Sequence, residues 1–498
     1  MVEGARSSLQ PRSKYQYYPF SPPDKNPPVY NPTRPTYSPT DIPVRSQEEY
    51  WGILEKLSKA KTKSEAAKIS KSTGVARIPV AAASPAFIHP AFFPLDPFHL
   101  FYENCTPWLW DIWSTEAKAP EAVAISTKKL EKLGRYVVAG MRTLPPSFCG
   151  TVRDPYLKRQ SQYKAFEWMA LLHWYLLPIG LELEVNPMLL ENLSLFVYIV
   201  EQAMTVRSWS EDELGDLRKV IDEFLEQFER LYVGSDPEKI HRCRLCLFQL
   251  VHVPMHIKWF GSIRVGSQAP VERAIGEVGH KIRSKKSPFA NLSNMIIEKE
   301  VVRIVQLYYP DLSDATPPPS KDRQIQPFQR LKFGRVQADS QIGASHMTAI
   351  RQLLGLHNTA DLLESGYDLK CYGKLKLAHG QTLRSQFTTS LELAFGEALA
   401  FYTLRSQPGV EGALSIVVVM MPLTQLEKRF RTVIRGRWAD GGGIVAMDIA
   451  KVRDVIGIWE APSKYVYMLR KHPALLSLPP SQRGLVDTMD REDDDGDE

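Results

Sequence analysis

The segment 271–292, VERAIGEVGHKIRSKKSPFANL, carries residue types and spacings that suit phosphate chemistry. Helical periodicity places Glu272 on one stripe with Gly276 and Gly279, so a carboxylate stands beside two positions where a ligand can approach the backbone. The end of this helix is cationic and is expected to bind nucleic acid, through Lys281, Arg283, Lys285 and Lys286. A carboxylate beside a cationic run is expected where a divalent metal ion meets a nucleic-acid phosphate. The alternative is a solvated helix end whose glycines allow close helix packing.

A second candidate site begins at Asp96 in the segment 95–104, LDPFHLFYEN. Asp96-Pro97 is typical of a helix start, because Asp caps free amides and Pro lacks the amide that would go unused there. His99 follows one turn later, and Glu103 follows four residues after that. A carboxylate with a nearby histidine holds a hard cation or orients one of its ligands. The alternative is a capping Asp beside a core histidine among aromatic side chains.

Cysteine and histidine spacing suggests a zinc site at Cys243-x2-Cys246 and His252-x3-His256. A zinc finger separates its two pairs by about 12 residues, whereas five separate them here. The segment 243–260 also has the pattern of one apolar helix, on which four ligands cannot converge, so we expect no zinc there, and we expect Cys105 to be a core thiol. The cysteines are odd in number and widely spaced, which favours a reducing compartment over a disulfide framework. They are Cys105, Cys149, Cys243, Cys246 and Cys371.

The composition is that of a globular, basic protein. The 498 residues are 44% hydrophobic, 10% aromatic and 24% charged, which excludes a wholly disordered chain and predicts two or three domains. Lys and Arg exceed Asp and Glu by 62 − 56 = 6. The segment 487–498 holds eight acids and one Arg, so the rest of the chain carries 61 − 48 = +13. A basic body favours partners that bear phosphate groups.

Signals for a membrane or for export are not visible in the sequence. The apolar runs 166–181 and 413–423 are interrupted or too short to cross a bilayer. The N-terminal sequence lacks the apolar stretch of a signal peptide. We therefore expect no membrane partner and a nuclear, otherwise cytoplasmic, location.

Helical periodicity dominates the chain from 120 to 232 and predicts four or five helices. The clearest is amphipathic, with apolar residues at three- and four-residue steps: Leu214, Leu217, Ile221, Phe224, Leu225, Phe228 and Leu231. Further helices are predicted at 47–73, 98–105, 243–260, 271–283 and 292–308. One face of the helix at 271–283 is expected to pack inward, and it comprises Val271, Ala274, Ile275, Val278 and Ile282.

The periodicity changes to two after Gln326. Alternating or β-branched runs between Gly-rich turns predict seven short strands, within 331–338, 371–378, 395–404, 413–421, 430–438, 443–449 and 454–459. Such a series is typical of a small β-barrel or sandwich.

The motifs DPFH at 96–99 and ERAIG at 272–276 resemble the C-terminal half of DDE transposases of the En/Spm (CACTA) type and of the related Kyakuja–Dileera–Zisupton group. Other stretches are similar to successive blocks of that family: YYPFSPP (17–23), DPFHLFYEN (96–104), KAFEW (164–168), HVPMHI (252–257), VERAIGEVGHKIRSKKSPFANL (271–292) and YGKLKLAHGQTLRS (372–385). Each block is short, but their order over most of Tyr15–Leu478 makes the resemblance fairly specific.

This resemblance implies an RNase-H-like core, split by a helical insertion, in which two Asp and one Glu hold Mg²⁺ (or Mn²⁺) for DNA cleavage and strand transfer. On the matching positions, Asp96 is the second acid, His99 is the histidine of the D-x-x-H motif, and Glu272 is the third acid. The two acids are 176 positions apart (272 − 96), and the segment between them would contain the insertion. The two carboxylates are then expected side by side at one rim of a mixed sheet.

The first acid of the family lies on an early strand, upstream of the Tyr- and Pro-rich block, and this chain begins just before that block. Asp24 and Asp41 lie among prolines with no strand before them, so neither is expected to replace it. We therefore expect a truncated transposase remnant that is inactive as this chain. The alternative is a non-catalytic DNA- or chromatin-binding interaction protein. Formation of a homo-oligomer is left open.

The combined prediction is an α+β multidomain protein, with a partial RNase-H-like core interrupted by an all-α insertion and followed by a small β-barrel-like domain. The predicted segments are a Pro- and Tyr-rich arm (1–50), a part of the core with the second acid (51–115), the helical insertion (116–240), the remainder of the core with the third acid and the basic helix end (241–312), a linker (313–327), the β-rich domain (328–478) and an acidic disordered tail (479–498).

Overall fold

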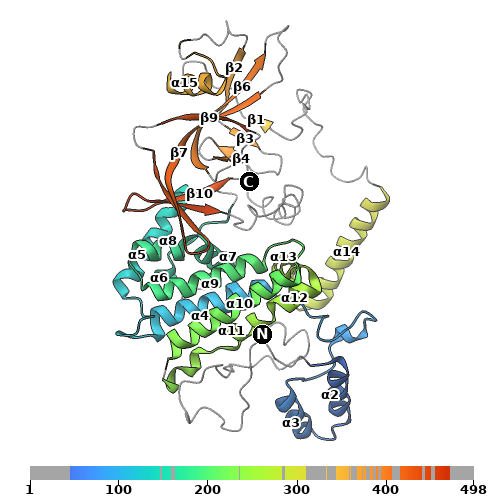
Figure 1. Ribbon diagram of the computed structural model, residues 1–498. Coiled ribbons are helices and arrows are strands. Elements are labelled where there is room, and N and C mark those ends of the chain that lie inside the picture. Colours follow the sequence, from blue (N-terminus) through green and yellow to red (C-terminus); the bar gives the residue numbers. More distant parts are fainter. Residues whose placement is uncertain are drawn as a thin grey trace. The chain divides into compact units, whose positions relative to one another are not determined.

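The computed structural model describes residues 45–309, 332–333 and 344–470, apart from short gaps. The gaps are 146–147, 159–162, 235, 283–285, 358, 360–366, 373, 377–381, 385–387, 391–393, 407–414, 440–442 and 450–454. The chain is α+β, with helices first and mainly strands after them (Figure 1). One compact unit takes its residues from Met1–Gly266 and Leu331–Glu498, and the other from Ser267–Arg330. The first 44 residues of the predicted arm, the predicted linker and the predicted tail lie outside the described residues.

Two capped helices open the described chain. α2 (Gln47–Lys59) begins with a capping box, in which Ser46 Oγ accepts from the Glu49 amide and the Glu49 carboxylate accepts from the Ser46 amide. α3 (Lys63–Thr73) ends at Gly74, whose φ of 79° is a left-handed conformation that glycine adopts without strain. Apolar residues of this region form a small cluster: Tyr50, Leu54, Val75, Phe87 and Phe93.

A long aromatic helical run follows, made of η2 (Phe98–Cys105), α4 (Thr106–Asp111) and η3 (Ile112–Glu116). η2 and η3 have the wider turns of a π-helix. Its three Trp side chains, Trp108, Trp110 and Trp113, are almost completely buried. The helix predicted at 98–105 is therefore confirmed, and its aromatic side chains belong to the main core.

The helical body is assembled around this run. Its elements are η1 (Val80–Ala83), α5 (Thr127–Gly140), η4 (Met141–Thr143), α6 (Pro155–Lys158), α7 (Ala165–Ala170), η5 (Leu171–Tyr175), α8 (Leu176–Glu182), α9 (Pro187–Ala203), α10 (Glu211–Phe228) and η6 (Glu229–Val233). α10 packs against α9 (Figure 1). The predicted apolar face of α10 is buried, which confirms the amphipathic helix, although Leu231 lies beyond it in η6.

A series of short helices completes this body: η7 (Pro237–Arg242), α11 (Leu245–Phe248), η8 (Gln249–His252), α12 (Val253–Phe260) and η9 (Ile263–Gly266). The helix predicted over 243–260 is present from Leu245 to Phe260, but the 3-10 segment η8 interrupts its α-helical hydrogen bonding. Pro254 lies in the first turn of α12, and a proline has no amide to donate within a continuous helix. A new helix consequently begins at that point.

The second unit contains α13 (Ala269–Lys281) and α14 (Pro288–Tyr308). The two predicted helices are confirmed, and each begins earlier than expected, with Pro270 and Pro288 in their first turns. Val271 and Ile275 are exposed, at 55% and 66%, so this unit does not bury the face of α13 that was predicted to pack inward.

The strands form antiparallel sheets. They are β1 (Lys332–Phe333), β2 (Tyr367–Tyr372), β3 (Lys374–Lys376), β4 (Thr382–Arg384), β5 (Thr388–Ser390), β6 (Ala394–Ser406), β7 (Ser415–Arg429), β8 (Val433–Trp438), β9 (Val445–Asp448), β10 (Ile456–Glu460) and β11 (Val466–Arg470). The larger sheet has the order β10-β11-β8-β7-β6-β2, with β5 on β6 and β9 on β7, and the smaller has the order β1-β3-β4.

The larger sheet curls because its long central strands are irregular. The register shifts between Ala398 and Ala400 in β6, and between Thr424 and Glu427 in β7. Such bulges bend a strand and increase its twist. α15 (Ala344–Leu353) covers part of this sheet, where Ile350 packs with residues of β6 and β7.

The sheet shares its core with the helical body, although the sequence predicts a separate β-domain over 328–478. Trp459, Tyr467 and Leu469 belong to the same apolar cluster as the aromatic helical run. Trp174 Nε1 donates to the carbonyl of Arg470 at 2.9 Å, and Tyr467 Oη donates to Glu182 at 2.6 Å. Both parts consequently form one compact unit.

The RNase-H-like core stays a prediction. Within 45–309, the described residues form helices, turns and isolated bridges, and the ladders among the described residues lie at 332 and beyond. The segment 51–115, predicted as part of that core, is helical where it is regular.

Candidate functional site

Asp96 starts the aromatic helical run. Its carbonyl accepts from the amide of Leu100 at 2.9 Å, and its Oδ1 accepts from the amide of Phe98 at 3.1 Å. Pro97 occupies the next position, where a helix does not need an amide donor. The helix start that the sequence predicts at Asp96-Pro97 is therefore confirmed, and the carboxylate caps it.

His99 bridges two carboxylates of this helix. Its Nδ1 lies 2.5 Å from Asp96 Oδ2, and its Nε2 lies 3.4 Å from Glu103 Oε2. The exposed fraction of the side chain rises along this row, from 4% at Asp96 through 16% at His99 to 41% at Glu103. The ring stands between the two acids, so these three groups form a row of polar contacts from the interior to the surface.

Two later segments hold the backbone before Asp96 in place. His256 Nδ1, on α12, accepts from the amide of Leu95 at 3.3 Å. Burial lowers the pKa of His256 to about 4, so the ring is neutral at pH 7 and can accept this bond. Gly266, at the end of η9, lies against the backbone of Pro94 and Leu95. A Cβ added to Gly266 would be 2.7 Å from Leu95 O and 2.8 Å from Pro94 Cβ. The corner at Asp96 is therefore built from three separate segments.

The helix is also fixed through Tyr102, one turn after His99. Tyr102 Oη lies 3.0 Å from His173 Nε2, and His173 Nδ1 lies 3.8 Å from Glu201 Oε1. All three side chains are largely buried, and burial raises the pKa of Tyr102 far above its usual value. Tyr102 consequently stays protonated and helps to fix the rotation of η2 in the body.

The other predicted site residues belong to the second unit or lie outside the described residues. Glu272 is exposed in the first turn of α13, and its amide donates to the carbonyl of Gln268 at 2.8 Å. Lys281 is the last residue of α13, and Lys286 is exposed between α13 and α14. Arg283, Lys285, Asp24 and Asp41 are not among the described residues. The pairing of Asp96 with Glu272 remains a prediction, because the two units are described separately.

The described residues do not by themselves fit a Mg²⁺ or Mn²⁺ pair. Among them, no three His, Cys, Asp or Glu side chains gather into a group that could hold a metal ion. Asp96 uses one carboxylate oxygen for Phe98 and the other for His99, and the His99 ring separates it from Glu103. Mg²⁺ binds through carboxylates that point at a common centre. A pair of divalent ions would need carboxylate ligands beyond these three groups.

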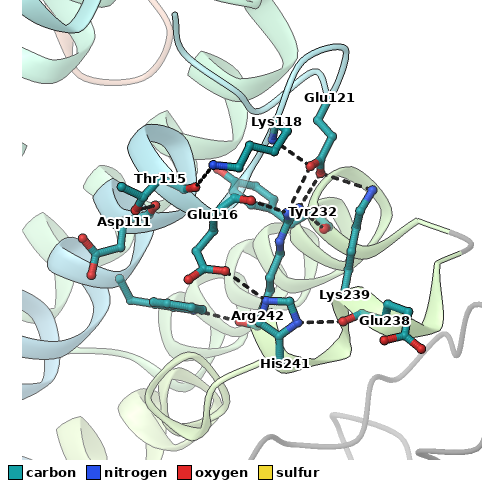
Figure 2. Close-up of polar contacts among 11 residues, drawn as sticks. Asp111, Thr115, Glu116, Lys118, Glu121, Tyr232, Glu238, Lys239, His241 and Arg242 are labelled. Atoms are coloured by element: carbon teal, nitrogen blue, oxygen red, sulfur yellow. Dashed lines mark hydrogen bonds and ion pairs between the residues drawn. The ribbon is translucent and has the colours of Figure 1, made fainter. Parts of the chain in front are cut away.

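A second polar cluster surrounds Arg242, which sequence reasoning did not identify (Figure 2). The Arg242 side chain is 3% exposed, and it donates to both carboxylate oxygens of Glu121, at 2.6 and 3.2 Å. It also donates to the carbonyl of Tyr232 at 3.0 Å. Lys239 Nζ approaches the same Glu121 carboxylate at 3.2 Å. Figure 2 shows how these groups converge from η6, η7 and the loop between η3 and α5.

This cluster is best explained as a structural tie. The hydrogen bond from Arg242 is the main cause that lowers the pKa of Glu121 to about 2, so the carboxylate is charged at pH 7. An open groove of about 480 Å³ adjoins it, lined by Glu121, Ala122, Leu231, Tyr232, Val233, Gly234, Asp236 and Lys239. Because Glu121 and Arg242 are 121 positions apart, no local motif could have indicated the pair.

Comparison of the chain with protein-family models, with curated proteins and with solved structures finds no match. Among the helices that the structure describes, none combines the length and the apolar character needed to span a membrane. The resemblance to DDE transposases therefore rests on the sequence motifs, and we carry it forward as a proposal.

Proposed function

We propose that this chain is a DNA-binding protein derived from a DDE-type DNA transposase. In this proposal Asp96 is the second acid, His99 orients it, and Glu272 is the third acid. The family reaction is metal-dependent DNA cleavage and strand transfer, and we propose that the site is incomplete in this chain. The nucleus is then the expected location, because the partner is DNA.

The observation that carries this proposal is the pairing of Asp96 with His99. A D-x-x-H motif places the ring one turn after the carboxylate, and the 2.5 Å contact from Nδ1 to Oδ2 is what such a motif would need. A histidine in this position fixes the direction of the carboxylate, as residues that support metal ligands commonly do. The alternative of a plain helix cap explains the Phe98 contact but gives no role to the ring.

Chain connectivity supports the assignment of Glu272. Gly266 packs against Leu95, the neighbour of Asp96, and six residues of chain then lead to Glu272 (272 − 266). Six residues span at most about 20 Å. The chain connectivity is therefore compatible with the proposed role of Glu272 as the third acid.

The cationic segment at the end of α13 supports DNA as the partner. Four cations lie within six positions, and the chain without its acidic segment 487–498 carries +13. Cationic side chains that contact phosphates release counterions from the DNA, so the logarithm of the binding constant falls linearly with the logarithm of the salt concentration. The salt dependence of DNA binding therefore provides the test of this proposal.

We predict that the full chain binds duplex DNA in a salt-dependent manner, and that this binding requires the cationic segment. Simultaneous replacement of Lys281, Arg283, Lys285 and Lys286 by Ala should lower affinity and reduce the slope of log affinity against log salt by up to about 4. Fluorescence anisotropy between about 50 and about 200 mM NaCl measures both quantities.

The matched control replaces four exposed lysines of α2, α3 and the turn between them by Ala, namely Lys56, Lys61, Lys63 and Lys68. This control variant loses the same four positive charges as the first variant, but from a different part of the chain. Equal losses in the two variants, or no loss in the first, would show that the cationic segment is an ordinary solvated surface.

We also predict that the full chain does not nick supercoiled DNA in Mg²⁺ or Mn²⁺. The proposal names two acids, and two carboxylates are too few to fix a pair of divalent ions for phosphoryl transfer. Nicking that disappears in both Asp96→Asn and Glu272→Gln, but persists in the exposed α14 control Glu298→Gln, would contradict the incomplete site. Agarose gel separation of supercoiled and relaxed plasmid provides the measurement.

A further inference from the structure

Two cysteines that are far apart in the sequence meet in the described body. Cys105 ends η2 and Cys246 lies in α11, 141 positions later (246 − 105), yet α11 packs against η2 and the two thiols interact with each other. Neighbouring contacts join the same segments: Trp108 Nε1 donates to the carbonyl of Arg242 at 2.9 Å, and the Arg244 guanidinium lies 3.2 Å from the centre of the Trp108 ring. The proximity of the sulfurs is therefore built into the packing of η2 against residues 242–246.

The two thiols differ in their surroundings. Cys105 is fully buried, whereas Cys246 is partly exposed. A hydrogen bond from Cys105 lowers the pKa of Cys246, assisted by the Arg244 guanidinium and by the amides of Cys246 and Leu247, while burial opposes this effect. Burial is the main cause that raises the pKa of Cys105. The thiolate is therefore favoured at Cys246, the less buried of the two residues, and the thiolate is the reactive form of cysteine.

We propose that Cys105 and Cys246 form a redox-active dithiol site that hydrogen peroxide converts into an intramolecular disulfide. In the first step the Cys246 sulfur attacks peroxide, so that an S–O bond forms and the O–O bond breaks. This gives a sulfenic acid and, after uptake of a proton, one water molecule. In the second step the Cys105 sulfur attacks the Cys246 sulfur, an S–S bond forms, the S–O bond breaks, and a second water leaves with the Cys105 proton. Two thiols lose two electrons in total, and peroxide gains them.

This site is independent of the proposed DNA function, because it uses neither Asp96 nor Glu272. It differs from the zinc arrangement considered for Cys243 and Cys246, because the partner of Cys246 comes from η2. In a reducing compartment the pair would stay as thiols until peroxide appears, and a thiol reductant would restore it.

The experiment treats the full chain, freed of reductant, with equimolar hydrogen peroxide, and then counts free thiols after denaturation. We expect the loss of two thiols per chain, full recovery with dithiothreitol, and disulfide-linked peptides that contain Cys105 and Cys246. Non-reducing electrophoresis should show a monomer. In Cys246→Ser no intramolecular disulfide should form, while the matched control Cys149→Ser should still lose two thiols.

Three results would overturn the proposal: no thiol loss in the wild-type chain, loss of two thiols in Cys246→Ser, or a peptide map that links other cysteines. Because Cys105 is fully buried, Cys105→Ser can fail to fold, and the wild-type peptide map then decides the question without any substitution. Phenylarsine oxide, which bridges two neighbouring thiols, gives a second test on the reduced chain. It should protect both Cys105 and Cys246 from alkylation, and alkylation of both in its presence would also contradict the proposal.

Discussion

His256 shows how one buried side chain connects the acidity of the solution to the candidate site. The ring is 4% exposed and accepts from the amide of Leu95, next to Asp96. Burial is the main cause that lowers its pKa to about 4, and the neighbouring His252 adds to this effect. In the unfolded chain the pKa of a histidine is about 6.5. The folded protein therefore favours the neutral ring.

We predict that this histidine makes the protein less stable as the pH falls. The unfolded chain takes up a proton below about pH 6.5, while the folded chain does so near pH 4, so the stabilisation is complete above pH 6.5 and is lost between these values. The part of the free energy of unfolding that is lost in this way is roughly 3 kcal/mol, because one pKa unit corresponds to about 1.4 kcal/mol. In His256→Gln, urea unfolding at pH 7.5 and pH 4.5 should show a smaller pH difference in the free energy of unfolding.

His357→Gln is the matched control, because His357 is exposed. His357→Gln should leave the pH dependence of the free energy of unfolding unchanged. The pH dependence that remains in His256→Gln is expected to come from His89 and His252, whose pKa values are also lowered to about 4. An unaltered pH difference in His256→Gln would show that this ring does not titrate between pH 6.5 and 4 in the folded state.

Still at the scale of residues, the sequence predicted contacts between neighbouring residues better than contacts between residues that are far apart in the chain. Asp96 and His99 were predicted to lie one turn apart, and they are in contact because that contact is local. Arg242 pairs with Glu121 and Cys105 meets Cys246, but these partners are more than a hundred positions apart. Partners of this kind depend on the packing of whole helices, which side-chain spacing does not encode.

At the scale of elements, the corner at Asp96 depends on how closely η9 approaches it. We predict that Gly266→Ala destabilises the helical body by about 1–3 kcal/mol, because the new methyl group would overlap the Leu95 carbonyl and Pro94. Gly276→Ala is the matched control, since the space around Gly276 on α13 is open and Ala favours a helix by up to about 1 kcal/mol.

Thermal unfolding followed by circular dichroism measures both variants. The midpoint should fall in Gly266→Ala and stay or rise in Gly276→Ala. Equal midpoints in Gly266→Ala and the unaltered chain would mean that η9 can move away from Leu95 at little cost, and the corner would then not be held from that side.

Secondary structure was predicted well where periodicity is long and less well where proline or loops interrupt it. α10 follows its apolar period closely, and its predicted face is buried. The single helix expected at 243–260 is divided into α11, η8 and α12, because Pro254 cannot continue a helix. β11, at Val466–Arg470, was missed, although it pairs with both β10 and β8. Its sequence, VYMLR, is apolar nearly throughout and therefore lacks the alternation used to find strands.

At the scale of the whole molecule, the shared core predicts cooperative unfolding of the sheet and the helical body. Trp174→Phe removes the donor to the Arg470 carbonyl and should destabilise both parts together by about 1 kcal/mol. Trp51→Phe, at an exposed position on α2, is the matched control and should have little effect. Coincident transitions for the strand and helix signals in circular dichroism and for tryptophan fluorescence are the expected result. Separate transitions would favour an independent β-domain.

The sequence by itself determined the α+β class, the order of helices before strands, the helix start at Asp96 and the basic character of the body. These properties are local or additive, because they follow from periodicity, capping chemistry and counts of charges. The tertiary structure decided which side chains meet: His256 and Gly266 at Leu95, Arg242 at Glu121, Cys105 at Cys246, and the sheet on the helical body. Such contacts depend on the packing of large apolar surfaces, whose cooperative fit is a property of the whole core and not of any one segment.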